Sequence, residues 1–223
     1  MTSLTYAGLD VGFSNDFMAQ VTVVKGNDEK IRIVNLDTWR NFDWHLWKRA
    51  MKEKHAKFNI DWICVDRTNN QTVVMELQGM GMSVEGVSFT NPRKYDMIQN
   101  MTKQIVTGEL VMPVLSEIQS VKQRNLATEL SEQLREQEYR HESANVKLGH
   151  PQGRHDDLLW ALCLALYGVS MKWSCCVPIV ECVDYEDTYP PEYQIPMPDR
   201  VMERFRGNGI TVTDVKITYP GDQ

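Results

Sequence analysis

Several features that would place a chain in a familiar class are absent from this sequence. No segment matches G-x-x-x-x-G-K-[ST] and no Gly-Lys dipeptide occurs, which excludes a P-loop nucleotide-hydrolysing motor. No apolar run reaches the roughly 18 residues that a membrane-spanning helix needs. No C-x-x-C pair or Cys/His spacing typical of zinc is present. Positive charge is not in excess either, and the net charge of −6 argues against tight DNA binding by this chain alone.

Cysteine is scarce, and its positions indicate reduced thiols. Cys64 and Cys163 lie in hydrophobic runs and are expected to be buried, and the other three cysteines lie near the C-terminus. An odd number of cysteines without a signal peptide leads us to expect a reducing, cytosolic environment.

The rest of the composition is that of a globular chain with one sizeable core. Its 223 residues, 42% hydrophobic and 24% charged, fit one domain with a short extension. Periodic hydrophobic patterns stop at Lys172, after which prolines recur with acidic residues between them. We therefore expect a domain over residues 1–172 and a proline-rich C-terminal tail or extension over residues 173–223.

Hydrophobic periodicity predicts an α/β fold. Three strands with short connections come first and are expected to form an antiparallel meander, at 4–10, 17–24 and 31–38. Strands and helices then alternate, which implies parallel strands with right-handed crossovers. The expected elements are helix 42–58, strand 60–66, helix 72–80, strand 84–89, helix 92–107, extended piece 110–114, helix 116–136, extended residues 139–148 and helix 155–169. The prediction is a mixed sheet of five or more strands with helices on both faces, the first strand lying beside the fourth.

Acidic residues stand at the ends of three core elements. Asp10 ends the first strand, Asp66 ends the fourth, and Asp156 and Asp157 open the last core helix. Because the two strands are expected to be neighbours under that helix, the carboxylates should converge. Mg²⁺ and Mn²⁺ prefer oxygen ligands, and carboxylates around two ions ~4 Å apart suit phosphodiester hydrolysis. Asp16, carried back toward Asp10 by a tight turn, is a further candidate ligand.

The sequence favours Asp157 over Asp156 as the ligand from the helix. Asp157, Ala161 and Ala165 form one stripe by i, i+4 spacing, and small residues allow that stripe to approach the sheet closely. Asp156 lines up with Trp160 on a neighbouring stripe. Both acids remain candidates, because Asp is also a preferred N-cap at the positive end of a helix dipole.

Cationic residues near these acids are candidates for contacts with a phosphate backbone. The candidate cations are Arg67, Arg93, Lys94, Lys103 and Arg154. His155 is a further candidate, which would order a water or touch a phosphate. Arg93 and Lys94 follow a strand at a helix N-terminus, which is suited to phosphate binding. Ordinary surface charge is the alternative for each cation, and a turn role is the alternative for Asp10 and Asp66.

Four motifs occur in a fixed order between about residues 4 and 170. They are Ala7-Gly-Leu-Asp10-Val-Gly followed by Asp16, Ile63-Cys-Val-Asp66-Arg-Thr, Gly86–Lys94 leading to Gly108–Pro113, and His155-Asp-Asp-Leu-Leu-Trp-Ala-Leu-Cys-Leu-Ala165. In this order they resemble the nuclease domain of the large terminase subunit of tailed phages. The last motif is the most specific, because it is similar to the His-Asp-Asp motif on the family's final core helix. Asn69-Asn70 departs from the pattern, since glycine-rich spacing would be expected after Asp66.

The resemblance implies a ribonuclease H-like fold and an endonuclease that cuts double-stranded viral DNA during packaging, using two Mg²⁺ or Mn²⁺ ions. By position it would make Asp10, Asp66, Asp157 and the adjacent Asp156 catalytic metal ligands, with Asp16 as an accessory ligand. The implied partners are double-stranded DNA and a packaging ATPase domain or other terminase or portal components, in the host-cell cytoplasm. Complete large terminases carry an ATPase with a phosphate-binding loop, so we expect an excised nuclease domain or one chain of a split system.

Other functions stay open at this point. A Holliday-junction resolvase of the same fold would prefer four-way junctions, and a ribonuclease H would prefer an RNA–DNA hybrid. A non-catalytic ribonuclease H-like interaction module is a third possibility, although the presence of all the acids argues against it. An actin-like ATPase or sugar kinase would need a duplicated domain and glycine-rich phosphate loops, and the sequence has neither.

Overall fold

The structure is a computed structural model that describes residues 3–12, 18–39, 43–68, 70–136, 138–142, 145–149 and 155–173. The chain divides into two compact units, Met1–Val169 and Ser170–Gln223. Of the second unit, only the last turn of a helix that ends at Trp173 lies within the described residues. The tail predicted over residues 173–223 otherwise lies outside them.

A six-stranded mixed sheet organises the first unit. The strands are β1 (Leu4–Val11), β2 (Met18–Lys25), β3 (Ile31–Trp39), β4 (Trp62–Asp66), β5 (Val84–Val87) and β6 (Leu110–Val111), in the order β5-β4-β1-β2-β3-β6. β1, β2 and β3 form the predicted antiparallel meander, and β4 pairs parallel with both β1 and β5. The expected position of β1 beside β4 is confirmed. The short extended piece after residue 109 becomes a sixth strand, parallel to β3.

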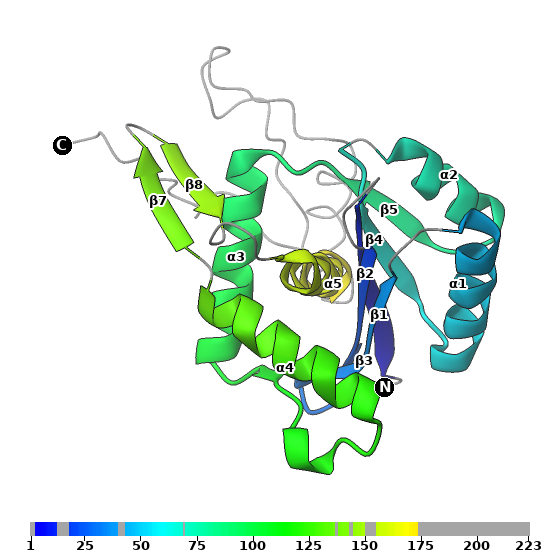
Figure 1. Ribbon diagram of the computed structural model, residues 1–223, viewed down its shortest axis with the longest axis horizontal. Helices are drawn as coiled ribbons and strands as arrows, with labels where there is room; N and C mark the ends of the chain where they lie inside the picture. The colour runs from blue at the N-terminus through cyan, green and yellow to red at the C-terminus, as the bar shows by residue number, and fades with distance from the viewer. Residues whose placement is uncertain are drawn as a thin grey trace, which may run out of the picture. The chain divides into compact units, whose positions relative to one another are not determined.

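Helices cover both faces of this sheet, as predicted (Figure 1). α1 (Trp44–Phe58) and α2 (Gln71–Gly79) lie on one face, and α3 (Asn91–Val106), α4 (Val121–Glu136) and α5 (Asp157–Trp173) lie on the other. The extended residues after α4 form a two-stranded sheet of β7 (Glu138–Glu142) and β8 (Asn145–Gly149).

The helix expected over residues 116–136 was predicted too long. A short 3₁₀ helix, η1 (Leu115–Glu117), comes first, and Ile118 then has extended backbone angles. α4 begins after Ser120, whose hydroxyl accepts a hydrogen bond from the backbone N–H of Gln123 at 3.4 Å. A serine at this position supplies an acceptor for the free N–H groups of a helix start, which places the N-terminus there.

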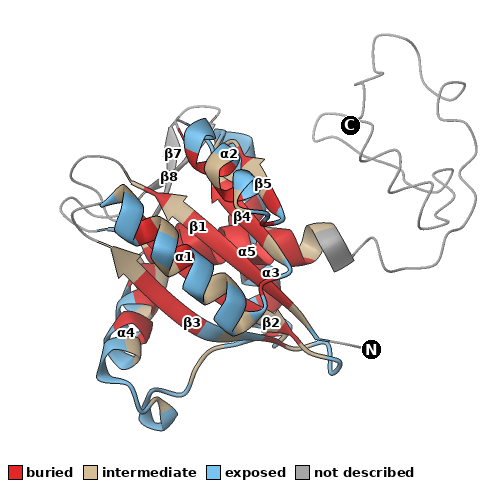
Figure 2. Cartoon of the chain, turned by 90° about the vertical axis from the view of Figure 1, so that its right-hand side faces the viewer, coloured by how far each residue is buried: buried red, intermediate tan, exposed pale blue. Residues whose placement is uncertain are grey.

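Two hydrophobic cores form because side chains alternate between the faces of each strand. On β1, Tyr6 points into the core that α3, α4 and α5 complete, whereas Ala7 and Leu9 point into the core that α1 and α2 complete. Figure 2 shows the buried residues running along the sheet and through α5, with exposed residues on the outer side of α1. Asp10, an even-numbered residue like Tyr6, therefore belongs to the α5 face.

α5 is buried along most of its length, with Leu158 to Leu166 all excluded from solvent. Within the described residues, no helix is both long and apolar enough to cross a membrane. Cys163 on α5 and Cys64 on β4 are buried free thiols, as predicted.

The outer edge of β3 is closed by a side chain rather than by a strand over part of its length. β6 pairs with β3 only at Ile31 and Arg32. Further along, the side-chain amide of Gln123 donates to the carbonyl oxygen of Leu36 at 2.7 Å and accepts from its N–H at 3.0 Å. The amide group of α4 therefore pairs with β3 as a neighbouring backbone would.

Candidate functional site

Asp10 and Asp66 stand side by side at the carboxyl ends of two parallel strands. Leu9 of β1 is opposite Val65 of β4 in the register, so the next residue of each strand is an aspartate. Alternation places both carboxylates on the α5 face, together with Tyr6. The convergence of these two acids follows from strand pairing.

α5 crosses β1 in direct backbone contact, and Gly8 allows that contact. A Cβ atom at Gly8 would lie 1.9 Å from the carbonyl oxygen of Ala161 and 2.4 Å from the backbone nitrogen of Ala165. The close approach predicted for this small-residue stripe is confirmed. Sequence reasoning missed Gly8, although an isolated glycine in a strand is a signal of close backbone approach.

This crossing point brings the N-terminus of α5 to Asp10. Asp157 lies one helical turn before Ala161, and Asp10 lies two residues beyond Gly8 on the same face of β1. At the other end of α5, a Cβ atom at Gly168 would lie 3.1 Å from the sulfur of Cys64, so α5 runs antiparallel to the strands. The helix acids thus meet the strand acids at one edge of the sheet.

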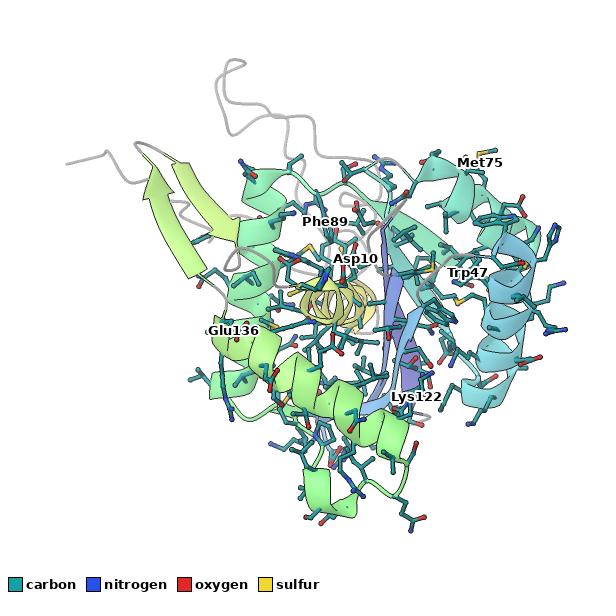
Figure 3. The ribbon with its side chains drawn as sticks, viewed as in Figure 1. Asp10, Trp47, Met75, Phe89, Lys122 and Glu136 are labelled. Carbon is teal, nitrogen blue, oxygen red and sulfur yellow. The ribbon has the colours of Figure 1, made fainter. Side chains whose placement is uncertain are left out.

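The electrostatics identify Asp10 as the common neighbour of the other acids. Burial raises the pKa of Asp10 well above its usual value, and the negative charges of Asp157, Asp66 and Asp156 raise the pKa further, in that order of size. Lys94 opposes these effects and lowers the pKa. Figure 3 shows Asp10 beside α5 on the face that α3, α4 and α5 cover. The site therefore concentrates negative charge where solvent screening is weak.

The carboxylate of Asp66 is held in place by Thr68. One oxygen of Asp66 accepts from the backbone N–H of Thr68 at 2.9 Å and from its hydroxyl at 2.6 Å. The Thr68 hydroxyl in turn accepts from the backbone N–H of Phe89 at 2.9 Å. The turn role that the sequence offered as an alternative for Asp66 is thus present, and it orients the carboxylate. Sequence reasoning did not single out Thr68, although aspartate side chains in turns commonly accept from the backbone N–H two residues further on.

The two helix acids have different surroundings. The indole N–H of Trp160 donates to Asp156 at 2.8 Å, which matches the shared stripe expected from the sequence. Asp157 lies 3.8 Å from the Nδ1 of His155, and its side chain is 14% exposed. Asp156 is therefore fixed by a buried ring, whereas Asp157 faces an exposed histidine and has the larger effect on Asp10.

Lys94 lies on a pair of aromatic rings next to the acids. Its ammonium group is 4.7 Å from the ring centroid of Trp160 and 5.1 Å from that of Phe89, and these two rings are 5.3 Å apart. Arg93 takes a different direction, donating to the hydroxyl of Tyr167 at 2.7 Å. Of the two cations at the start of α3, Lys94 is the one that acts on Asp10.

The match to a known family follows the same stretch of chain. Residues 7–167 match the family model described as the terminase RNaseH-like domain. The chain belongs to this family. The predicted resemblance and the ribonuclease H-like fold are confirmed. The matched region includes Asp10, Asp66, Asp156 and Asp157.

Solved structures of terminases have the same fold at low sequence identity. The large terminase nuclease from thermophilic phage G20c with bound magnesium is 20% identical, with a TM-score of 0.59, covering 74% of this chain and 81% of that one. The large terminase nuclease domain of Thermus phage P74-26 is 18% identical (TM-score 0.58; 73% and 78% covered). The HK97 bacteriophage large terminase is 13% identical (TM-score 0.55), with 75% of this chain but only 40% of that chain covered. No curated protein matches the sequence.

The remaining predicted residues of this terminase-family site are placed differently. Arg67 is exposed at the same edge of the sheet, and its Nε donates to Ser88 at 2.9 Å. Lys103 is in the last turn of α3, about 13 Å along the helix from Lys94 at the usual rise per residue, and is not brought to the acids. Asp16 and Arg154 lie outside the described residues.

The acids surround Asp10 without meeting at one point. In the part of the chain that the structure describes, no three His, Cys, Asp or Glu side chains are grouped closely enough to hold a metal ion as they stand. Asp10 nevertheless interacts with three other carboxylates from two separate elements. The chemistry of the set is that of hard oxygen donors with an excess of negative charge, which suits a divalent cation such as Mg²⁺ or Mn²⁺.

Proposed function

We propose that this chain is a metal-dependent endonuclease that hydrolyses phosphodiester bonds of double-stranded viral DNA during genome packaging. The observation that carries the proposal is the convergence of Asp10, Asp66 and Asp157 from β1, β4 and α5 on one face of the sheet. Membership of the terminase RNaseH-like family supports it, as does the magnesium bound by the similarly folded G20c nuclease.

Two divalent ions, Mg²⁺ or Mn²⁺, are the proposed cofactors. Asp10, Asp66 and Asp157 would hold them, with Asp156 beside them and Asp16 as an accessory ligand. Each carboxylate raises the pKa of Asp10, and divalent cations would offset that repulsion. Because Thr68 occupies one oxygen of Asp66, the other oxygen is the one available to an ion. When bound, two ions supply activation of the attacking water and stabilisation of the leaving oxygen.

The chain's own residues have the task of placing the phosphate backbone. The Lys94 ammonium sits at the acids on the Phe89–Trp160 ring pair, where it would bind a phosphate that approaches Asp10. His155, 44% exposed beside Asp157, would touch the next phosphate or order a water. Arg67 lies at the ends of β4 and β5, where it would contact the phosphates of a DNA strand that continues past Asp66.

During packaging, cutting and DNA translocation would be carried out by different domains. The chain lacks a P-loop and covers only 40% of the HK97 large terminase. The proposed partners are therefore double-stranded DNA and an ATPase domain or other terminase or portal components that drive translocation. In this arrangement the present chain contributes the cut that ends packaging.

A plasmid-nicking assay tests the proposal. Supercoiled plasmid is incubated with the full chain in Mn²⁺, Mg²⁺ or EDTA, beside Asp10→Asn, Asp66→Asn and a control, Asp28→Asn, at the opposite end of the sheet. We expect metal-dependent nicking that falls at least about a hundredfold in the first two variants and is unchanged in the control. Absence of nicking, or equal nicking in all variants, would refute the proposal. A four-way junction and an RNA–DNA hybrid in parallel test resolvase and ribonuclease H activity.

A further inference from the structure

α1 is strongly basic although the chain is acidic. The helix carries five Lys or Arg residues and one glutamate, in a chain whose net charge is −6. The cations are Lys48, Arg49, Lys52, Lys54 and Lys57. None of them belongs to the site around Asp10, because α1 and α5 lie on opposite faces of the sheet (Figure 1).

Three cations of α1 have carboxylate partners, Lys57 lies 5.0 Å from the ring centroid of Phe58, and Lys52 is exposed. Lys48 binds Glu76 of α2 at 3.1 Å, and Lys54 binds the buried Asp37 of β3, so both have structural partners. Arg49 is 4.0 Å from Glu53, and both of these side chains are more than 70% exposed. The exposed side chain of Lys52 has no ion pair or hydrogen bond with any other described residue.

Two exposed cations, Arg49 and Lys52, share the outer face of the helix with Glu53. Trp47 and Met51 are buried against the sheet and define the inner face. Arg49 and Lys52, three residues apart, are neighbours on the opposite side. Leu46 is the one large apolar side chain exposed on α1, so the helix offers charge with a single apolar side chain rather than the apolar cluster that protein interfaces use. This favours a polyanion with regularly spaced charges over an acidic protein.

α1 starts at the edge of the sheet where the acids stand. Val11, which follows Asp10, pairs with Met18, and Met18 pairs with Trp39 at the end of β3. α1 begins at Trp44, and its 15 residues extend about 22 Å from that edge. The start of α1 and the acids therefore lie at the same end of the sheet, on its two faces.

We propose that the outer face of α1, centred on Arg49 and Lys52, binds the phosphate backbone of duplex DNA as an anchoring surface that does not cut. The identity of the polyanion rests on the proposed function. The surface itself rests on the charge of α1. This contact supplies the salt-dependent affinity that a site made of carboxylates lacks.

Binding of a fluorescent 30-base-pair duplex to the full chain in EDTA tests this surface without cleavage. Arg49→Gln/Lys52→Gln should lower the affinity about tenfold and reduce the slope of log K against log salt by about 2, since each lost phosphate contact removes about 1. The charge-keeping variant Arg49→Lys/Lys52→Arg should bind as the wild type does. Glu53→Gln should strengthen binding about twofold, whereas Glu129→Gln, an exposed glutamate on α4, should not.

The outcomes separate this inference from the proposed function. Equal affinity and salt slope in all variants overturn the α1 surface, even if nicking depends on Asp10. If nicking does not depend on Asp10, the proposed function is refuted, but the α1 surface is still supported as long as the charge variants change DNA binding. If the double variant loses affinity for poly-L-glutamate but not for the duplex, α1 binds an acidic protein and the inference is wrong.

Discussion

The two faces of the sheet carry opposite charge near the same edge, and they carry it in different ways. On the α5 face, Asp10 and the acids around it are partly buried, and burial together with the negative charges of Asp157, Asp66 and Asp156 raises the pKa of Asp10. On the α1 face, the side chains of Arg49 and Lys52 are exposed to solvent. Buried like charges cost folding energy, whereas exposed ones cost little. The partly buried carboxylates around Asp10 therefore indicate the reaction site, and the exposed cations of α1 indicate a surface that attracts a polyanion at long range.

The largest expected effect concerns the packing that creates the acidic face. Gly8→Ala places a Cβ atom against the backbone of α5, which cannot yield as a side chain would. We expect a loss of about 3 kcal/mol or more in unfolding free energy, at the upper end of overpacking effects. Gly79→Ala, on α2 with open space around it, should be neutral or stabilising by up to about 1 kcal/mol. Urea denaturation compares the two, and equal stability would contradict backbone contact at Gly8.

A smaller effect is expected at the ring that holds Asp156. Trp160→Phe keeps most of the ring packing but removes the N–H donor to the carboxylate, which costs about 1.5–3 kcal/mol for a bond to a charged group. Nicking should slow about three- to tenfold, with a higher Mn²⁺ concentration needed for half-maximal rate. Tyr167→Phe removes a hydroxyl bound to Arg93 instead and is the control. An unchanged Mn²⁺ dependence in Trp160→Phe would show that Asp156 does not need this bond.

The smallest effect is a pH dependence confined to the acidic face. The pKa of Asp10 is higher in the folded than in the unfolded chain, so the folded state binds this proton more tightly. As pH falls from 7 through the folded-state pKa toward the unfolded value, Asp10 should therefore contribute increasing stability in EDTA. Thermal unfolding at pH 7.5 and 5 should show this gain, by a few degrees, in the wild type relative to Asp10→Asn. A constant difference between the two proteins across this range would contradict it.

The sequence was sufficient for those parts of the site that depend on periodicity. The expected adjacency of β1 and β4 predicted that Asp10 and Asp66, at the ends of these strands, would be neighbours, and the i, i+4 stripe predicted the close approach of α5. These features follow from helix and strand geometry alone. The same reasoning identified the meander and the parallel pairing of β4 with β1.

Other parts depended on side-chain directions and long-range contacts. Thr68 links Asp66 to Phe89, 21 residues further along the chain, and the local turn at Asp66 does not specify that long-range bond. Lys103 was counted among the cations near the acids, but it lies in the last turn of α3, nine residues further along the helix than Lys94. The basic face of α1 was missed because periodicity was used there only to find the buried side.

The Gln123 amide on the edge of β3 has a consequence for how the folded chain behaves beside copies of itself. An uncovered strand edge offers unpaired N–H and C=O groups that another chain can extend into an aggregate. By bonding both backbone groups of Leu36, one side chain of α4 blocks that edge beyond the two residues paired with β6. A single glutamine thus blocks this edge at Leu36 without the length of another strand.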